Sequence, residues 1–266
     1  MDDILLGQYV PGQSFLHRLD PRSKMITVTI LVWLVFLLKN PAEYATFVVF
    51  VILAYLTSGV ARSFWKSLKP GFYLVIFTII LNAVFTPGEV LLSMGILKLS
   101  REGLIQGLTM GLRLLLLISL SSLVTLTTSP VRMTEGLEQL MTPLKKVNFP
   151  ASELAMMMNI ALRFIPTFWE EWDKIRKAQL SRGADFESWN PASRIKYVTA
   201  MLIPLFVSAF RKADELSTAM EARGYVVGAP RTSLNVLKFN SRDYVLLISV
   251  MVLSSVFVAY RADLLW

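Results

Sequence analysis

The feature that most constrains this sequence is a set of apolar stretches that contain almost no charged residues. A bilayer core about 30 Å thick requires roughly 20 apolar residues from each membrane-spanning helix. The sequence therefore predicts an all-α, polytopic protein with about five transmembrane helices in the lipid bilayer, of which the first and third are the shortest. The five stretches are Met25–Leu38, Tyr44–Val60, Gly71–Thr86, Gly103–Ser129 and Tyr244–Tyr260.

Composition supports this class and excludes several kinds of site. Charged residues make up 17% of the 266 residues, below the value of about 25% that is typical of soluble domains. The absence of cysteine excludes disulfides and thiolate metal sites, and the single histidine, His17, excludes a multi-histidine metal site. In so apolar a chain, we interpret the net charge of +8 as attraction to a membrane surface. We expect no nucleic-acid partner, no metal and no cofactor.

The distribution of Lys and Arg orients the predicted spans, because basic residues concentrate in short cytoplasmic loops. With the N-terminus inside, the outer loops hold only Lys39, Lys98 and Arg101. The cytoplasmic face receives Arg18, Arg22, Lys24, Arg62, Lys66 and Lys69. The chain is then divided into a membrane region with four transmembrane helices (1–129), a cytoplasmic insertion (130–242) and a C-terminal transmembrane helix (243–266).

The insertion alternates between apolar helical periodicity and chain breakers, which predicts three amphipathic helices. Ser129-Pro130 suits the start of the first helix, because serine caps a helix and proline fits its first turn. Asn190-Pro191 marks the start of the third. Gly183 suits a left-handed C-cap that ends the second. The expected extents are 130 to about 144, about 151 to 182, and about 190 to 224.

The second and third of these helices end alike. Each finishes with a small residue, an arginine and a glycine, as Ser181-Arg182-Gly183 and Ala222-Arg223-Gly224. Each also contains a proline, Pro166 or Pro204, which is expected to kink the helix because it removes a backbone hydrogen bond. We interpret the two helices as a paired device.

Two explanations of the arginines stay open. An arginine in the last turn of a helix is favoured by the helix macrodipole and can bond the free carbonyl groups. Alternatively, Arg182 and Arg223 project from the helix ends and make bidentate contacts with carboxylates or carbonyls of a partner. The shared context of the two arginines favours contact with a partner.

Two other features each have two readings. The methionines Met156, Met157, Met158, Met201 and Met220 are either ordinary apolar filling or an adaptable surface that repacks against more than one partner. Arg113 is the clear charge inside a predicted span, where charges are costly and often functional. It is explained either by an interhelical or headgroup contact or by a role in transport.

Several classes of function lack their signature residues. No G-x-x-x-x-G-K-[ST] phosphate loop is present, so the chain is not expected to hydrolyse ATP. None of the predicted spans contains a carboxylate, which counts against an autonomous secondary transporter or channel, the main alternative function. A membrane enzyme is disfavoured because no His/Asp/Glu or Cys/His constellation exists.

At several motifs along nearly the whole chain, the sequence resembles the transmembrane T component of energy-coupling factor (ECF) transporters. The N-terminal segment Tyr9–Lys24, which reads YVPGQSFLHRLDPRSK, carries this resemblance. It continues in Thr127–Pro130, in Ala161–Pro166, and in the two helix ends at Ala178–Gly183 and Ala219–Tyr225. The paired Arg-Gly motifs are its most specific part.

The resemblance implies a non-catalytic scaffold in the plasma membrane of a prokaryote. Such a scaffold joins two cytoplasmic ABC-type ATPases, which hydrolyse the ATP, to a small membrane-embedded S component that binds a vitamin. Arg182 and Arg223 would then dock into the ATPases, and their movement would reorient the S component. The residues expected at the S-component interface are Met156, Met157, Met158, Leu162, Met201 and Phe206.

Overall fold

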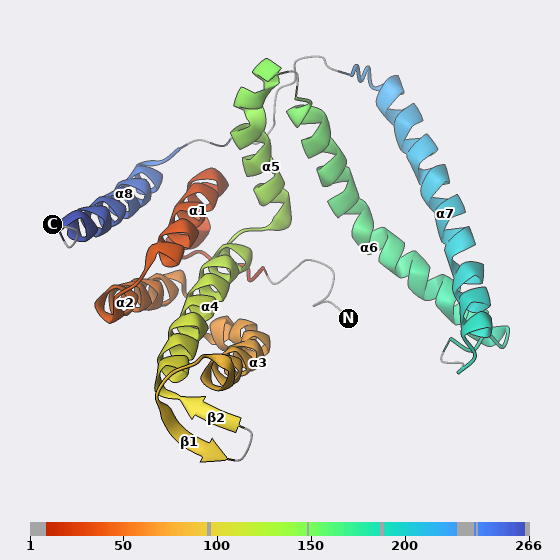
Figure 1. Cartoon of the computed structure of the whole chain (residues 1–266). Coiled ribbons are helices and arrows are strands. Elements are labelled where there is room, and N and C mark those ends of the chain that lie inside the picture. The colour runs from red at the N-terminus through yellow and green to blue at the C-terminus, as the bar shows by residue number, and fades with distance from the viewer. Residues whose placement is uncertain are drawn as a thin grey trace. The chain divides into compact units, whose positions relative to one another are not determined.

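The computed structural model describes residues 9–94, 97–147, 149–186, 189–227, 237 and 239–263. These residues are almost entirely helical, with one short β-hairpin (Figure 1). In chain order the elements are η1 (Leu16–Arg18), α1 (Pro21–Leu37), α2 (Pro41–Ser58), α3 (Ala61–Phe85), β1 (Val90–Met94), β2 (Leu97–Ser100), α4 (Arg101–Thr127), α5 (Pro130–Met141), η2 (Thr142–Val147), α6 (Ala151–Ser181), α7 (Pro191–Ala222) and α8 (Ser241–Asp263). The predicted all-α class is confirmed.

The described residues form two compact units. One, which we call the apolar unit, comprises residues 9–139 together with 237 and 239–263, and contains α1 to α4, most of α5, and α8. The other, the insertion unit, comprises residues 140–147, 149–186 and 189–227 and contains η2, α6 and α7. Most of helix α5, predicted as the first helix of the insertion, therefore belongs to the apolar unit.

Helix starts are encoded by local capping chemistry. Asp20 and Asn190 each precede a proline, and their side chains accept the backbone N–H of Arg22 at 2.9 Å and of Ala192 at 3.1 Å. At the start of α2, the Glu43 carboxylate accepts the backbone N–H of Asn40 at 3.0 Å. These contacts satisfy donors that a helix's first turn otherwise leaves free.

The apolar helices α1, α2, α3, α4 and α8 cover the five predicted spans. Within the described residues, three helices are long and apolar enough to cross a membrane, namely Pro41–Ser58, Arg101–Thr127 and Pro191–Ala222. The first two match predicted spans, and Gly71–Phe85 is a shorter apolar helical stretch. The third is α7, which the sequence analysis assigns to the insertion; it meets the criterion because residues 198–210 contain no charged side chain.

Two local expectations need correction. The third helix begins at Ala61 rather than at Gly71, so Arg62, Lys66 and Lys69 lie in helix α3 and not in a loop. The reason is that Gly59, with a left-handed φ of 68°, ends α2 abruptly and lets α3 begin after Val60. The segment expected to be an outer loop contains the antiparallel β1–β2 hairpin, in which Leu92 pairs with Leu99.

The core of the apolar unit lies between α1, α2, α4 and α8. It includes Leu31 and Val35 from α1, Phe47 from α2, Leu120 from α4 and Val250 from α8, all at most 2% exposed. These side chains come from helices far apart in sequence, so hydrophobic burial joins both ends of the apolar unit.

Helices α3 and α4 approach closely along a stripe of glycines, Gly103, Gly107 and Gly111, spaced four residues apart on one face of α4. A Cβ at Gly107 would lie 3.0 Å from both Cα and the carbonyl oxygen of Ile79, which is tighter than ordinary packing. Small residues at this spacing let helix backbones approach in membrane proteins.

Arg113, the charge inside a predicted span, makes an interhelical contact. Its guanidinium Nη2 donates to the carbonyl oxygen of Leu38 at 3.2 Å and to the Tyr44 hydroxyl at 3.0 Å. It therefore joins α4 to the end of α1 and the start of α2, which is one of the two explanations left open by the sequence.

We predict that Gly107→Ile weakens the α3–α4 contact, because a branched side chain cannot fit against the Ile79 backbone. Overpacking of this kind costs about 1–3 kcal/mol. The free energy of unfolding in detergent should fall by that amount, while Thr109→Ile, which enlarges a neighbouring position that is only partly buried, should have little effect. Equal stability of the two variants would contradict close packing at Gly107.

Candidate functional site

The two arginine tips have nearly the same backbone geometry. Arg182 caps α6 with φ −89° and ψ 7°, and Arg223 caps α7 with φ −90° and ψ 9°. Each is followed by a left-handed glycine, Gly183 with φ 83° and Gly224 with φ 75°. Glycine adopts this conformation without the steric penalty that a Cβ introduces. The predicted helix ends are confirmed, and their likeness extends from sequence to conformation.

The hydrogen bonds at the two tips also correspond one to one. In α6, the N–H of Gly183 donates to Leu180 and that of Ala184 donates to Gln179, both at 3.0 Å. In α7, the N–H of Gly224 donates to Glu221 at 2.9 Å and that of Tyr225 donates to Met220 at 3.0 Å. This is the Schellman pattern, in which backbone N–H groups satisfy the last carbonyls of the helix.

The arginine side chains are consequently available. Arg182, Gly183, Arg223 and Gly224 are exposed, and neither glycine has a neighbour within 4 Å of the place where a Cβ would lie. In the part of the chain that the structure describes, neither guanidinium forms a hydrogen bond or an ion pair. The last-turn carbonyls named above already accept backbone N–H groups, so the geometry leaves both guanidinium groups free for a partner.

Helices α6 and α7 are antiparallel neighbours. Gln179, near the end of α6, donates to the carbonyl of Ala200 at 3.5 Å, and Lys212 forms a 2.9 Å ion pair with Glu171. Hydrogen bonds from Ser208 and Lys212 lower the pKa of Glu171 below its usual value, so this pair stays charged near neutral pH. The contacts fix the register of the two helices.

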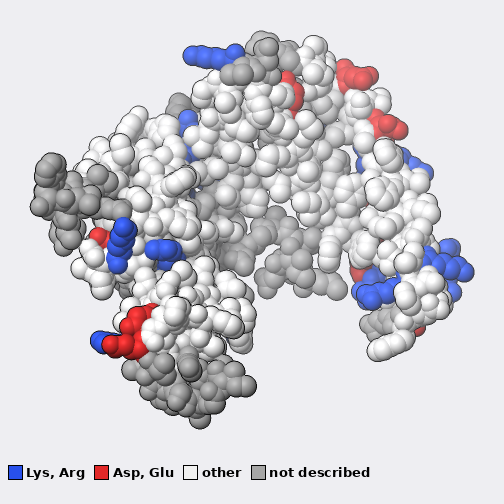
Figure 2. Space-filling view, in the orientation of Figure 1, with Lys and Arg blue, Asp and Glu red and all other residues white. Residues whose placement is uncertain are grey.

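Antiparallel packing sends the two tips in opposite directions. At 1.5 Å per residue, Arg223 lies about 35 Å of helix axis beyond Ala200, beside which α6 ends. Figure 2 shows Lys and Arg side chains gathered at the end of the pair where α6 finishes and α7 begins. Pro166 and Pro204 lie inside continuous helices, and the kinks expected there stay predictions.

The residues expected at an S-component interface differ in exposure. Met157, Met158 and Phe206 are exposed, whereas Met156 and Leu162 are half-buried. Met201 is only 3% exposed, so it offers no free surface; it follows Ala200, whose carbonyl meets α6. The exposed apolar stripe of α7 includes Ile203, Phe206, Val207 and Phe210. The sequence analysis selected Phe206 alone from this stripe, although the helical spacing was visible.

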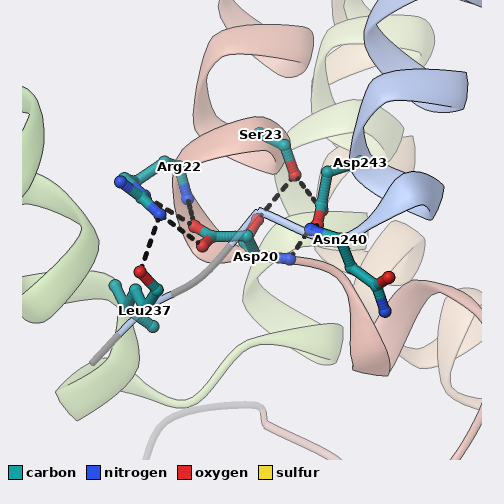
Figure 3. Close-up of polar contacts among 6 residues, drawn as sticks. All are labelled: Asp20, Arg22, Ser23, Leu237, Asn240 and Asp243. Atoms are coloured by element: carbon teal, nitrogen blue, oxygen red, sulfur yellow. Dashed lines mark hydrogen bonds and ion pairs between the residues drawn. The ribbon is translucent and has the colours of Figure 1, made fainter. Parts of the chain in front are cut away.

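A second polar cluster, which the sequence analysis did not identify, surrounds the first turn of α1 (Figure 3). Arg22 donates to the Asp20 carboxylate through Nε at 3.0 Å and Nη2 at 2.8 Å, and to the Leu237 carbonyl at 3.2 Å. Its guanidinium also lies 4.2 Å from the centroid of the Phe239 ring. Burial raises the pKa of Asp20, but the hydrogen bonds and charge of Arg22 outweigh this and hold the pKa below its usual value.

Asp243, at the start of α8, completes the cluster. Its carboxylate accepts the backbone N–H of Asp20 at 2.8 Å, the hydroxyl of Ser23 at 2.7 Å and the backbone N–H of Asn240 at 2.8 Å. Asp243 is 1% exposed. A single sequence contains no signal for this pairing, because Asp20 and Asp243 are 223 positions apart.

The neighbouring residues join α1 to the end of α4. Lys24 is 4% exposed, and its ammonium donates to the Thr127 carbonyl at 3.0 Å and to the Thr128 hydroxyl at 2.9 Å. His17 donates through Nε2 to the Val10 carbonyl at 2.9 Å, and the N–H of Val10 donates to Leu126 at 3.0 Å. Several residues of the N-terminal motif, namely Val10, His17, Asp20, Arg22, Ser23 and Lys24, therefore form structural hydrogen bonds.

These features define an α-helical membrane protein that carries an inserted, antiparallel helix pair. A family model described as "Cobalt transport protein" matches residues 12–234. The chain is 46% identical over 264 residues to the energy-coupling factor transporter transmembrane protein EcfT of Bacillus subtilis (strain 168), covering 98% of this chain and 100% of the relative. It is 49% identical over 255 residues to the protein of the same name from Brevibacillus brevis, covering 95% and 96%.

A third relative of that name, from Acidaminococcus fermentans, is 48% identical over 244 residues, which is 91% of each chain. The chain belongs to the EcfT family of energy-coupling factor transporter transmembrane proteins. The resemblance stated from the sequence motifs is confirmed, as is the assignment to membrane transport.

We predict that a side chain with a branched Cβ opens the tip of α6. Gly183→Val places that side chain at a left-handed residue, which costs roughly 1–2 kcal/mol, so the Ala184 amide should exchange its hydrogen about tenfold faster. Gly183→Asn is the matched control, because asparagine tolerates this conformation. Equal protection of Ala184 in both variants would show that the left-handed turn does not hold the tip.

Proposed function

We propose that this protein is the non-catalytic scaffold of an ECF-type importer, coupling ATP hydrolysis in two cytoplasmic ATPases to reorientation of a substrate-binding S component. On this proposal it lies in the plasma membrane of a prokaryote, with its N-terminus and residues 130–242 in the cytoplasm. The observation that carries the proposal is the pair of matching, exposed arginine tips at opposite ends of an antiparallel helix pair.

The geometry of the tips supports two separate binding sites for soluble partners. A helix end that closes through backbone hydrogen bonds and a bare glycine is narrow enough to enter a groove, with a guanidinium at its apex. Arginine suits such contacts because its planar fork binds carboxylates and carbonyls in a fixed geometry. Tips about 35 Å apart along the helix axis cannot enter one groove, so they address two copies or two related subunits.

The apolar stripe of α7 supports a membrane-embedded partner. Ile203, Phe206 and Phe210 are 59%, 59% and 71% exposed, and they repeat at helical spacing on a chain segment without charge. A row of large apolar side chains of this kind is the usual mark of a binding surface. Met157 and Met158 on α6 add flexible contacts.

We predict that Arg182→Glu combined with Arg223→Glu abolishes ATPase association and substrate uptake. Reversing both charges replaces donors with acceptors at the two sites, so copurification of the ATPases should be lost and uptake should fall at least a hundredfold. The matched control is Arg176→Glu with Arg211→Glu, which makes the same charge change at exposed helix positions away from the tips.

Uptake by the tip double variant at the level of the control would overturn the coupling role. ATP-independent substrate flux in liposomes that contain only this chain would instead support an autonomous transporter or channel. Copurification of two ATPases with an S protein and this chain, together with ATP-dependent flux, is the expected result.

We also predict that Phe206→Asp with Phe210→Asp separates the two kinds of partner. Charges on the apolar stripe should remove the S component from the purified complex, while the ATPases stay bound because both tips are unchanged. Phe206→Leu with Phe210→Leu keeps the stripe apolar and should retain all subunits. Loss of the ATPases alone from the aspartate variant would contradict the assignment of the stripe.

A further inference from the structure

Two segments of the apolar unit lead to and from the insertion unit. One is the end of α4 at Thr127 and Thr128, which continues into α5, and the other comprises Leu237, Phe239 and Asn240, just before α8. Residues 20–24, the cap and first turn of α1, contact both of these segments.

Lys24 holds the outgoing connection. Its ammonium bonds a carbonyl at the C-terminal end of α4 and the hydroxyl of the next residue, where a positive charge is favoured by the helix dipole. Thr127 and Thr128 are themselves 2% and 4% exposed, so water does not compete for these bonds. Farther along, α5 packs closely on the same turn, because a Cβ at Gly136 would lie 2.9 Å from Cβ of Pro21.

Arg22 and Ser23 hold the returning connection. Arg22 bonds the Leu237 carbonyl and stacks on the Phe239 ring, while Ser23 and the Asp20 N–H bond the Asp243 carboxylate. The Asp243 carboxylate also accepts the N–H of Asn240, which shapes the turn before α8. Three consecutive residues, Arg22, Ser23 and Lys24, thus bond both segments of the apolar unit that lead to and from the insertion unit.

We propose that this turn of α1 is a permanent anchor that transmits force from the insertion to the membrane helices. The proposal rests on the coupling function above. When a partner moves the tips of α6 and α7, the force is transmitted to the apolar helices through the segments after Thr127 and before Asp243. Both segments are bonded to the same turn of α1. The force therefore displaces α1 and the helices packed on it, instead of extending the two chain segments.

The burial of the charged groups explains why the anchor holds. Removing a hydrogen-bond partner from a buried charged group leaves that group unsatisfied, which costs more than losing a surface ion pair. Asp243 and Lys24 are both nearly inaccessible, and each is satisfied by groups on other segments. In this proposal Arg22, Ser23 and Lys24 are positioning residues for coupling.

The first test measures coupling in the complete reconstituted transporter. Arg22→Gln keeps a polar side chain but removes the guanidinium group. That group bonds the Asp20 carboxylate and the Leu237 carbonyl and lies over the Phe239 ring. ATP hydrolysis should stay within about twofold of wild type, and substrate transported per ATP should fall about tenfold. Arg18→Gln is the control, because Arg18 lies outside the cluster and its guanidinium donates to the Gln13 side chain at 3.4 Å. An unchanged transport-to-ATP ratio in Arg22→Gln would overturn the anchor.

The second test removes the buried acceptor of the anchor and then partly restores it. Asp243→Ala deletes the carboxylate that accepts hydrogen bonds from Asp20, Ser23 and Asn240, whereas Asp243→Asn keeps one acceptor oxygen. In the reconstituted transporter, substrate transported per ATP should fall about tenfold in Asp243→Ala and by less in Asp243→Asn. An unchanged transport-to-ATP ratio in Asp243→Ala would overturn the proposal.

A third measurement separates the anchor from the coupling function. In the isolated chain, the Arg22→Gln variant should exchange the amide hydrogens of Asn240 and Asp243 about tenfold faster than wild type. If the wild-type chain binds no ATPases but this difference is found, the coupling function fails and the anchor stands. Equal exchange in both proteins, with ATPases bound normally, would reject the anchor alone.

Discussion

Burying a carboxylate is unfavourable unless hydrogen-bond donors replace the water that it loses. Asp243 meets this requirement with a hydroxyl and two backbone N–H groups, drawn from the first turn of α1 and from the turn before α8. The position of α8 against α1, and with it the closure of the apolar core around Val250, depends on this interaction. The apolar side chains provide burial without direction, and the buried polar groups select one arrangement.

The parts of the fold that depend on neighbouring residues were predictable from the sequence. The starts of α5 and α7 and the ends of α6 and α7 follow from Pro130, Asn190, Gly183 and Gly224, because caps act over a few residues. Contacts between distant segments were not predictable, since Asp243 carries no mark of its partners. The start of α3 at Ala61 was missed because the apolar stretch begins only at Gly71, although Gly59, which ends α2, is a local signal.

In the candidate site, too, local motifs were predictable from the sequence and contacts between distant segments were not. The paired arginines were found from the sequence because both copies carry a local motif, and the structure adds that their caps form the same hydrogen bonds. The burial of Met201 could not be inferred from composition, because it depends on how the neighbouring segments pack around that part of α7. The regular spacing of the glycines on α4 was visible in the sequence. Only the structure shows that they allow the Ile79 backbone of α3 to approach α4 closely.

Arg113 gains significance when it is considered together with Lys24. One cation joins the beginning of α1 to the end of α4, and the other joins the carbonyl of Leu38, at the opposite end of α1, to the body of α4. Sliding α1 along α4 by one helical turn, about 5.4 Å, would break both contacts at once. The two contacts therefore prevent α1 and α4 from sliding past each other. The two helices can tilt or translate only together, and any sliding within the membrane region has to occur at other helix pairs.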